Sequence, residues 1–117
     1  MSDALIRYQA ASLAAFQQLR DGETRLGQVI RYADPALPLA DALLLAKQQG
    51  CAVVLLGVPE DIGPRANLGQ GGSDLGWQAF ARKFINLQQN EFLDGSKLLM
   101  LGELDCAALQ QQSQDAD

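Results

Sequence analysis

The stretch from Val53 to Asn90 reads VVLLGVPEDIGPRANLGQGGSDLGWQAFARKFINLQQN and decides how this chain folds. It begins with an aliphatic run, continues through a glycine-rich polar segment and ends in an amphipathic segment that carries aromatic residues. A short aliphatic run bounded by glycines is typical of a strand covered on both faces, and apolar residues three to four positions apart are typical of a helix. The stretch therefore predicts a strand, a long loop and a helix, which is the build of an active-site segment.

A second aliphatic run lies downstream, at Lys97 to Leu104, where the sequence reads KLLMLGEL. We expect the first strand over Cys51 to Val58, and we expect Asp94-Gly95 to turn the chain into the second strand. A strand, a helix and a strand in that order form a βαβ unit with parallel strands. The sequence thus predicts an α/β fold with a βαβ unit at 51–104.

The helix between the two strands has a clear apolar face. Ser73 or Asp74 can cap its N-terminus. Its apolar residues recur at helical spacing, and packing against the sheet is favoured over a recognition role for the aromatic ones. The face consists of Trp77, Phe80, Ala81, Phe84 and Leu87.

Two further helices are predicted before the βαβ unit. Apolar positions every three to four residues indicate a helix within Asp3 to Arg20, and Pro38 to Gly50 has the start and stop signals of a short helix. Between them, Glu23 to Leu37 lacks periodicity and is expected to be an extended connector. Residues 1–117 are expected to form a single domain, with residues 110–117 as a frayed tail.

The composition limits the classes of function. The 117 residues are 48% apolar, which supports one ordinary core. The 14 acidic and nine basic residues give a net charge of −5, which argues against a nucleic-acid partner or an anionic membrane. No apolar run approaches the ~20 residues of a membrane helix and no cleavable signal is visible, so the sequence is typical of a soluble cytoplasmic protein. Cys51 and Cys106 are expected to be buried reduced thiols, with a disulfide or a reactive thiol as the alternatives.

Acidic residues lie at the carboxyl ends of both predicted strands, where ligands of open parallel sheets bind. Four carboxylates at one rim could assist acid-base chemistry or bind a hard cation. The favoured alternative is that they cap helices or pair with Arg65. The chain has no histidine, so a complete metal centre of the usual histidine-containing types is excluded. The four acidic residues are Glu60, Asp61, Glu103 and Asp105.

The loop between the first strand and its helix suggests two kinds of ligand. Its glycines, with Gly71-Gly72 before a possible helix N-terminus, could cradle a phosphate, but a tight irregular loop is the favoured reading because no complete phosphate-binding motif is present. Arg65, Asn67 and Gln70 could recognise a carboxylate or amide-bearing small molecule. Equally, Asn67 could hold a turn while Arg65 pairs with a neighbouring acid.

The segment GVPEDIGPRANLGQGGSDLGWQAFARKFINLQ at 57–88, followed by LLMLGELDC at 98–106, resembles the opening part of the arginase, agmatinase and formimidoylglutamase family. It looks most like the formimidoylglutamase branch, and the resemblance fades toward the N-terminus. It implies a three-layer α/β/α sandwich with a mainly parallel sheet, of which this chain would form part. It also implies chemistry in which two manganese ions activate a hydroxide that attacks an amidine or guanidine carbon. In the formimidoylglutamase branch the products are glutamate and formamide.

The metal-ligating motifs of that family are GG-x-H, D-x-H-x-D and S-x-D-x-D, and none occurs in this chain. No catalytic or metal-binding residue is therefore expected, and no cofactor is expected in the chain itself. The resemblance implies that the first strand, its loop and the following helix correspond to part of the family's active-site rim. Arg65 and Asn67 are the candidates for substrate or structural contacts at that rim.

Three hypotheses follow from the sequence. The leading one is an N-terminal portion, or a truncated relative, of a formimidoylglutamase-like ureohydrolase that has no activity alone. The second is an interaction module that associates with itself or with the remainder of an arginase-like fold, since a sheet cut after two strands leaves unpaired edges. The third is a binder of small ligands or phosphate that uses the glycine loop alone.

Overall fold

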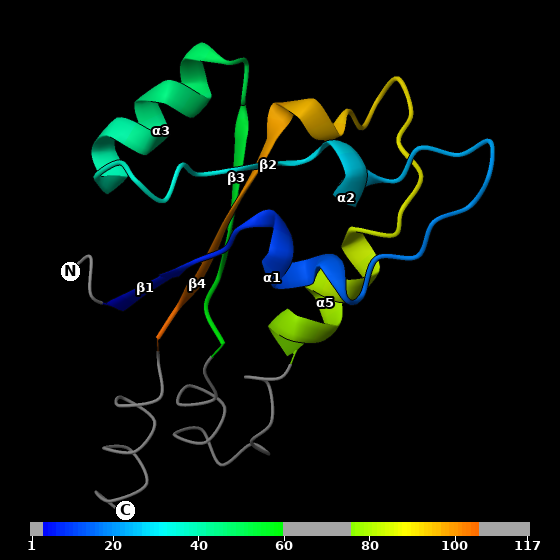
Figure 1. Cartoon of the computed structure of the whole chain (residues 1–117), viewed down its shortest axis with the longest axis horizontal. Coiled ribbons are helices and arrows are strands. Elements are labelled where there is room, and N and C mark those ends of the chain that lie inside the picture. The colour runs from blue at the N-terminus through cyan, green and yellow to red at the C-terminus, as the bar shows by residue number, and fades with distance from the viewer. Residues whose placement is uncertain (1–3, 60–75, 106–117) are drawn as a thin grey trace, which may run out of the picture.

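The structure is a computed structural model that describes residues 4–59 and 76–105, and its sheet is organised around strand β4 (Leu98–Leu104) (Figure 1). Strand β3 (Val53–Gly57) runs parallel along one edge of β4. The other edge carries β2 (Arg31–Tyr32), which is parallel, and β1 (Leu5–Arg7), which is antiparallel. The fold is therefore α/β with a mixed sheet of four strands.

The predicted βαβ unit is confirmed. Helix α5 (Gly76–Phe84) lies between β3 and β4 in the chain, and the two strands pair in parallel from Val53 with Leu98 to Gly57 with Glu103. A register shift between Leu55 and Leu56 leaves one additional residue in β4. Before β4, the side chain of Asp94 accepts a hydrogen bond from the Ser96 amide at 2.9 Å and begins the short 3-10 helix η3 (Gly95–Lys97).

Two apolar clusters cover the two faces of β4, because successive side chains of a strand point to opposite sides. Leu98 and Met100 join the cluster under α1 (Ala10–Ala14), α2 (Leu26–Val29) and α5. Leu99 and Leu101 pack with Ala42 and Ala46 of α3 (Leu39–Gln48). Figure 1 accordingly shows α3 on one side of the sheet and the other helices on the opposite side. In the described part of the chain, none of the helices has the length and apolar character needed to cross a membrane.

The prediction of one helix within Asp3 to Arg20 is wrong for its first part. Leu5–Arg7 forms β1, and the helix is limited to Ala10–Ala14. The ladder with β4 overrides the helical spacing of the apolar residues, since pairing with an existing strand satisfies the backbone of β1. Gln9 then starts α1 by donating its backbone N–H to Ser12 Oγ at 2.9 Å.

The connector predicted over Glu23 to Leu37 is only partly extended, because it contains α2 and β2. The buried side chain of Leu26 anchors α2 in the core. The helix predicted within Pro38 to Gly50 is confirmed as α3, and Gly50 has the positive φ of +102° that a left-handed cap requires.

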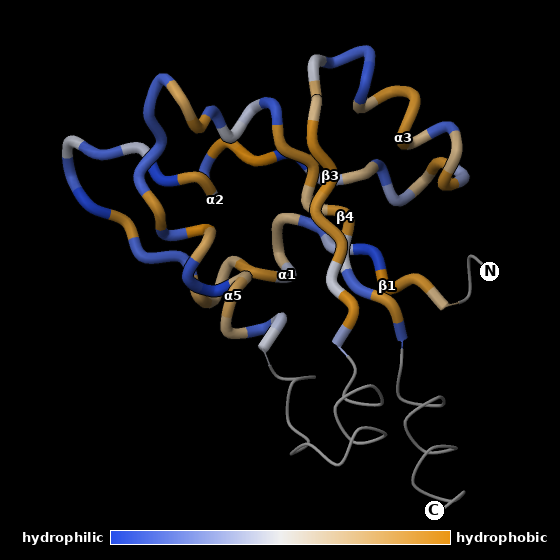
Figure 2. The backbone as a smooth tube through the Cα atoms, turned by 180° about the vertical axis from the view of Figure 1, so that it is seen from behind, coloured by the Kyte–Doolittle hydropathy of each residue, from blue (hydrophilic) through white to orange (hydrophobic). Residues whose placement is uncertain are grey.

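The prediction that the first strand is covered on both faces is wrong. Val53, Val54 and Leu56 of β3 are 48%, 49% and 40% exposed, whereas β4 is buried over Leu98–Gly102. Both strands are strongly hydrophobic (Figure 2), but β3 pairs along one edge only among the described residues. The aliphatic composition thus predicts that a strand forms here, but it does not predict whether the strand lies in the centre or at the edge of the sheet.

Cys51 lies beside β3 as a free, partly buried thiol. Desolvation by burial raises its pKa above the ordinary value, and nearby Arg31 opposes this shift. The thiol form is therefore favoured, as expected for a cysteine that packs against the sheet. Cys106 lies outside the described residues.

Candidate functional site

The carboxyl ends of β3 and β4 lie side by side, because Gly57 pairs with Glu103. This is the edge at which the sequence predicts a ligand site. Glu103 is partly buried there, and the exposed Asp105 follows it with its backbone N–H donating to Ala4 O at 2.6 Å. The other predicted site residues lie outside the described residues: Glu60, Asp61, Arg65, Asn67, Gln70 and the glycines of the phosphate hypothesis except Gly57 and Gly76.

A chain of side-chain hydrogen bonds connects three elements at this edge. Tyr8, which follows β1, donates its hydroxyl proton to Glu103 Oε1 of β4 at 2.5 Å. Trp77 of α5 donates its indole N–H to the Tyr8 hydroxyl at 3.1 Å. The Tyr8 hydroxyl is therefore both donor and acceptor, and it fixes the Glu103 carboxylate relative to α5.

The Tyr8 phenol remains neutral in this environment. Burial and the hydrogen bond to Glu103 raise its pKa to about 12, although the Trp77 hydrogen bond acts in the opposite direction. A neutral phenol can donate to the carboxylate, whereas a phenolate would repel it. The role that this geometry gives Tyr8 is to orient Glu103.

Replacing Glu103 with glutamine should lower the Tyr8 pKa from about 12 toward its ordinary value of 10.0, while burial keeps it above that value. A phenolate absorbance titration measures the change. Burial also raises the pKa of Tyr32, so Tyr8→Phe serves to identify the Tyr8 transition. An unchanged Tyr8 transition in Glu103→Gln would contradict the hydrogen-bonded arrangement.

The same pKa shift predicts how stability depends on pH. Because the folded-state pKa lies above the unfolded-state value, the contribution of Tyr8 is complete below about pH 10 and is lost as the pH rises toward 12.

Aromatic rings pack along α5 behind this hydrogen-bond chain. Trp77 stacks on Phe80 with ring centroids 5.8 Å apart, and Phe80 stacks on Phe84 at 5.2 Å. The predicted packing role is confirmed for Trp77 and Phe84, which lie against the core, whereas Phe80 is 45% exposed. A Cβ built on Gly57 would overlap the Trp77 ring, so the glycine lets the indole approach β3 closely.

The described part of this edge does not fit a manganese centre. Within residues 4–59 and 76–105, no group of three or more histidine, cysteine, aspartate or glutamate side chains is suited to hold a metal ion. We therefore derive no catalytic step that involves a metal from these residues.

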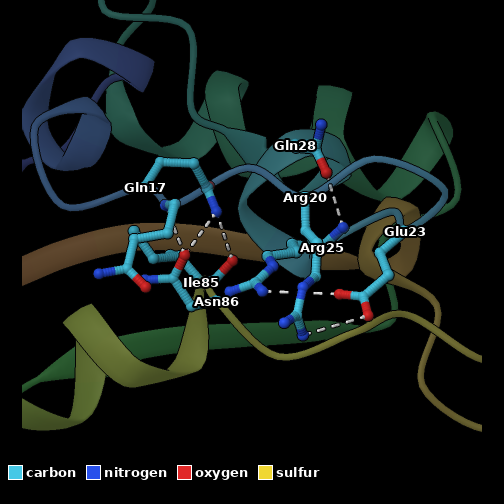
Figure 3. Close-up of polar contacts among 8 residues, drawn as sticks. Gln17, Arg20, Glu23, Arg25, Gln28, Ile85 and Asn86 are labelled. Atoms are coloured by element: carbon cyan, nitrogen blue, oxygen red, sulfur yellow. Dashed lines mark hydrogen bonds and ion pairs between the residues drawn. The ribbon is translucent and has the colours of Figure 1, made fainter.

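A second polar network joins the segment after α1 to the end of α5, and no motif of the sequence predicts it (Figure 3). Gln17 Nε2 donates to Ile85 O at 2.9 Å and to Asn86 Oδ1 at 3.0 Å. Beside it, Glu23 lies within ion-pair distance of Arg25 at 3.5 Å and of Arg20 at 3.8 Å. The Gln17 contacts join two segments that are distant in the sequence, which indicates a structural role, whereas the ion pairs of Glu23 are local.

Comparison with models of known protein families, with curated proteins and with solved structures gave no match to this chain. The likeness to the ureohydrolase family therefore rests on the motifs at 57–106 alone. The functional proposals below depend on those motifs together with the geometry of the described residues.

Proposed function

We propose that the chain is the N-terminal portion, or a truncated relative, of a formimidoylglutamase-like ureohydrolase. The observation that carries the proposal is the parallel β3–α5–β4 unit. The motif-bearing segment connects the carboxyl end of β3 to α5, which is the connection that holds ligands in folds of this class. Helices against both faces of β4 support the further proposal that the domain is part of a three-layer α/β/α sandwich with a mainly parallel sheet.

In this proposal the chain contributes the rim of an active site and is not catalytic alone. The two manganese ions of the family's reaction would be held by residues outside this chain, because its 117 residues include no histidine and none of the three metal motifs. Arg65 and Asn67 are proposed to contact substrate or to support the rim. Glu103, oriented by Tyr8, contributes a fixed negative charge at the carboxyl end of β4.

We expect the purified 117-residue chain to leave formimidoylglutamate unhydrolysed when manganese is added. The measurement is the formation of formamide and glutamate against a protein-free blank. Clear turnover would overturn the proposal that the chain lacks activity by itself. The reading frame that follows Asp117 tests the family assignment separately: GG-x-H and D-x-H-x-D motifs in frame support it, and a continuing frame without them counts against it.

The exposed β3 favours a second function, self-association. Its outer edge presents backbone N–H and C=O groups that have no strand partner among the described residues, and Cys51 to Val58 contains no charged residue to block pairing. A groove of about 390 Å³ between β3 and α3 adds apolar surface, lined partly by Leu43, Val54 and Leu99. We propose that a second copy of the chain pairs with this edge.

Substituting Val54 with lysine should prevent this association without unfolding the domain, because the side chain is half exposed. Light scattering across a concentration series should show dimer formation for the unmodified chain and a monomer for Val54→Lys. Leu19→Lys is the matched control, since Leu19 is 70% exposed and belongs to the segment between α1 and α2, not to β3. A chain that stays monomeric at every concentration, or a Val54→Lys variant that still dimerises, would refute the proposal.

A further inference from the structure

A cavity of about 240 Å³ lies between α1, α5 and the carboxyl end of β4. Its polar lining comes from Tyr8 after β1, Ser12 of α1, Gln78 and Arg82 of α5, and Glu103 of β4. The volume is below the ~300 Å³ at which sites for drug-sized ligands begin, so an occupant would have to be small.

The cavity carries one positive and one negative side chain that are not paired with each other. In the described part of the chain Arg82 forms no ion pair, and its guanidinium lies 4.0 Å above the centre of the Phe16 ring. Glu103 is held by Tyr8, which is held in turn by Trp77. Both charges are thus fixed by aromatic side chains before any ligand arrives, and such preorganisation favours binding.

The two charges restrict the class of ligand. Glu103 would repel a simple anion, and Arg82 would repel a simple cation. A zwitterion satisfies both, because Arg82 can donate to a carboxylate while Glu103 accepts from an ammonium group. Gln78 lies one helical turn before Arg82 on the same face of α5, where its amide can donate to the same carboxylate.

We propose that this cavity binds a small zwitterion of the size of a free α-amino acid, with its carboxylate at Arg82 and Gln78 and its ammonium group at Glu103. The proposal rests on charged and polar side chains of α5 and β4 and on Tyr8 and Phe16, which contact them. It goes beyond the proposed ureohydrolase relationship and does not depend on it. It requires no metal and no chemical step.

Calorimetric titration with L-alanine tests the proposal, with Trp77 fluorescence as a second readout because Trp77 is the single tryptophan of the chain. We expect saturable binding that weakens about tenfold or more for N-acetyl-L-alanine, which lacks the ammonium group, and for L-alaninamide, which lacks the carboxylate. No saturable binding of L-alanine at its highest soluble concentration, or equal binding of all three compounds, would overturn it.

Variants that each remove one charge test which side chain binds the carboxylate of the ligand and which binds its ammonium group. Arg82→Gln should weaken L-alanine about tenfold but should not weaken L-alaninamide, because this cation loses no partner and is no longer repelled by the guanidinium. Glu103→Gln should weaken L-alanine similarly but should not weaken N-acetyl-L-alanine, because this anion loses no partner and is no longer repelled by the Glu103 carboxylate. Lys83→Gln is the matched control, since Lys83 neighbours Arg82 but does not line the cavity, and it should bind L-alanine normally. Arg82 is exposed, so its variant should fold, and unchanged L-alanine binding by Arg82→Gln would refute the site.

Discussion

Replacing Gly102 with alanine is expected to destabilise the domain by more than ~3 kcal/mol, the sum of backbone strain at a positive φ and a steric clash. Gly102 has a φ of +140°, and a Cβ built on it would collide with the carbonyl oxygen of Ile6. It lies in the middle of the sheet, where it pairs with Arg7 of β1 and Leu56 of β3. Chemical unfolding followed by circular dichroism measures the loss.

Gly50→Ala provides the matched control for this prediction. Gly50 has a φ of +102°, but nothing lies within 4 Å of the position that a Cβ would take. Its substitution should therefore lower the free energy of unfolding only through backbone strain at the positive φ, by on the order of 1 kcal/mol. Equal losses for the two variants would show that the contact with β1 does not matter.

The close approach at Gly102 also connects the fold to the candidate site. Glycine at this position lets the backbone of β1 lie against β4, and Tyr8 continues that pairing by donating its backbone N–H to Leu101 O at 3.0 Å. The same approach brings the Tyr8 hydroxyl to Glu103. A Gly102→Ala variant that still folds should thus also show a Tyr8 pKa closer to its ordinary value.

The elements predicted correctly from the sequence are those with strong local signals. Strands β3 and β4 are continuous aliphatic runs, helix α5 has apolar residues at helical spacing, and α3 has both its start and its stop residue. Strands β1 and β2 have three and two residues, too short for any periodicity to appear. They exist because β4 offers partners far away in the sequence, and local patterns contain no such information.

The candidate site was predictable only in part for the same reason. Glu103 is predictable as a site residue because it lies at the end of an aliphatic strand, but its partner Tyr8 is 95 residues away in the chain. The hydroxyl of a buried tyrosine usually forms a hydrogen bond. This rule predicts that Tyr8 has a partner, but it does not predict which residue the partner is. The sequence motifs pointed instead to Arg65 and Asn67, which lie outside the described residues.

Truncating Leu99 to alanine is the other substitution from which we expect a large effect. Leu99 is fully buried in β4, and its cluster on the α3 side includes Ala33, Ala42 and Ala46. Alanine side chains cannot extend to fill the space that the lost atoms leave. The cost should therefore lie in the upper part of the ~2–5 kcal/mol range for buried Leu→Ala changes.

Leu44→Ala is the control for this truncation. It removes the same atoms from a residue of α3 that is 55% exposed, so the cavity term is absent and the loss should stay below ~1 kcal/mol. Thermal or chemical unfolding compares the two variants directly. The difference between them measures how much α3 contributes by packing on β4, because both substitutions shorten the same side chain and only Leu99 lies between the helix and the sheet. Similar losses would mean that α3 is loosely attached.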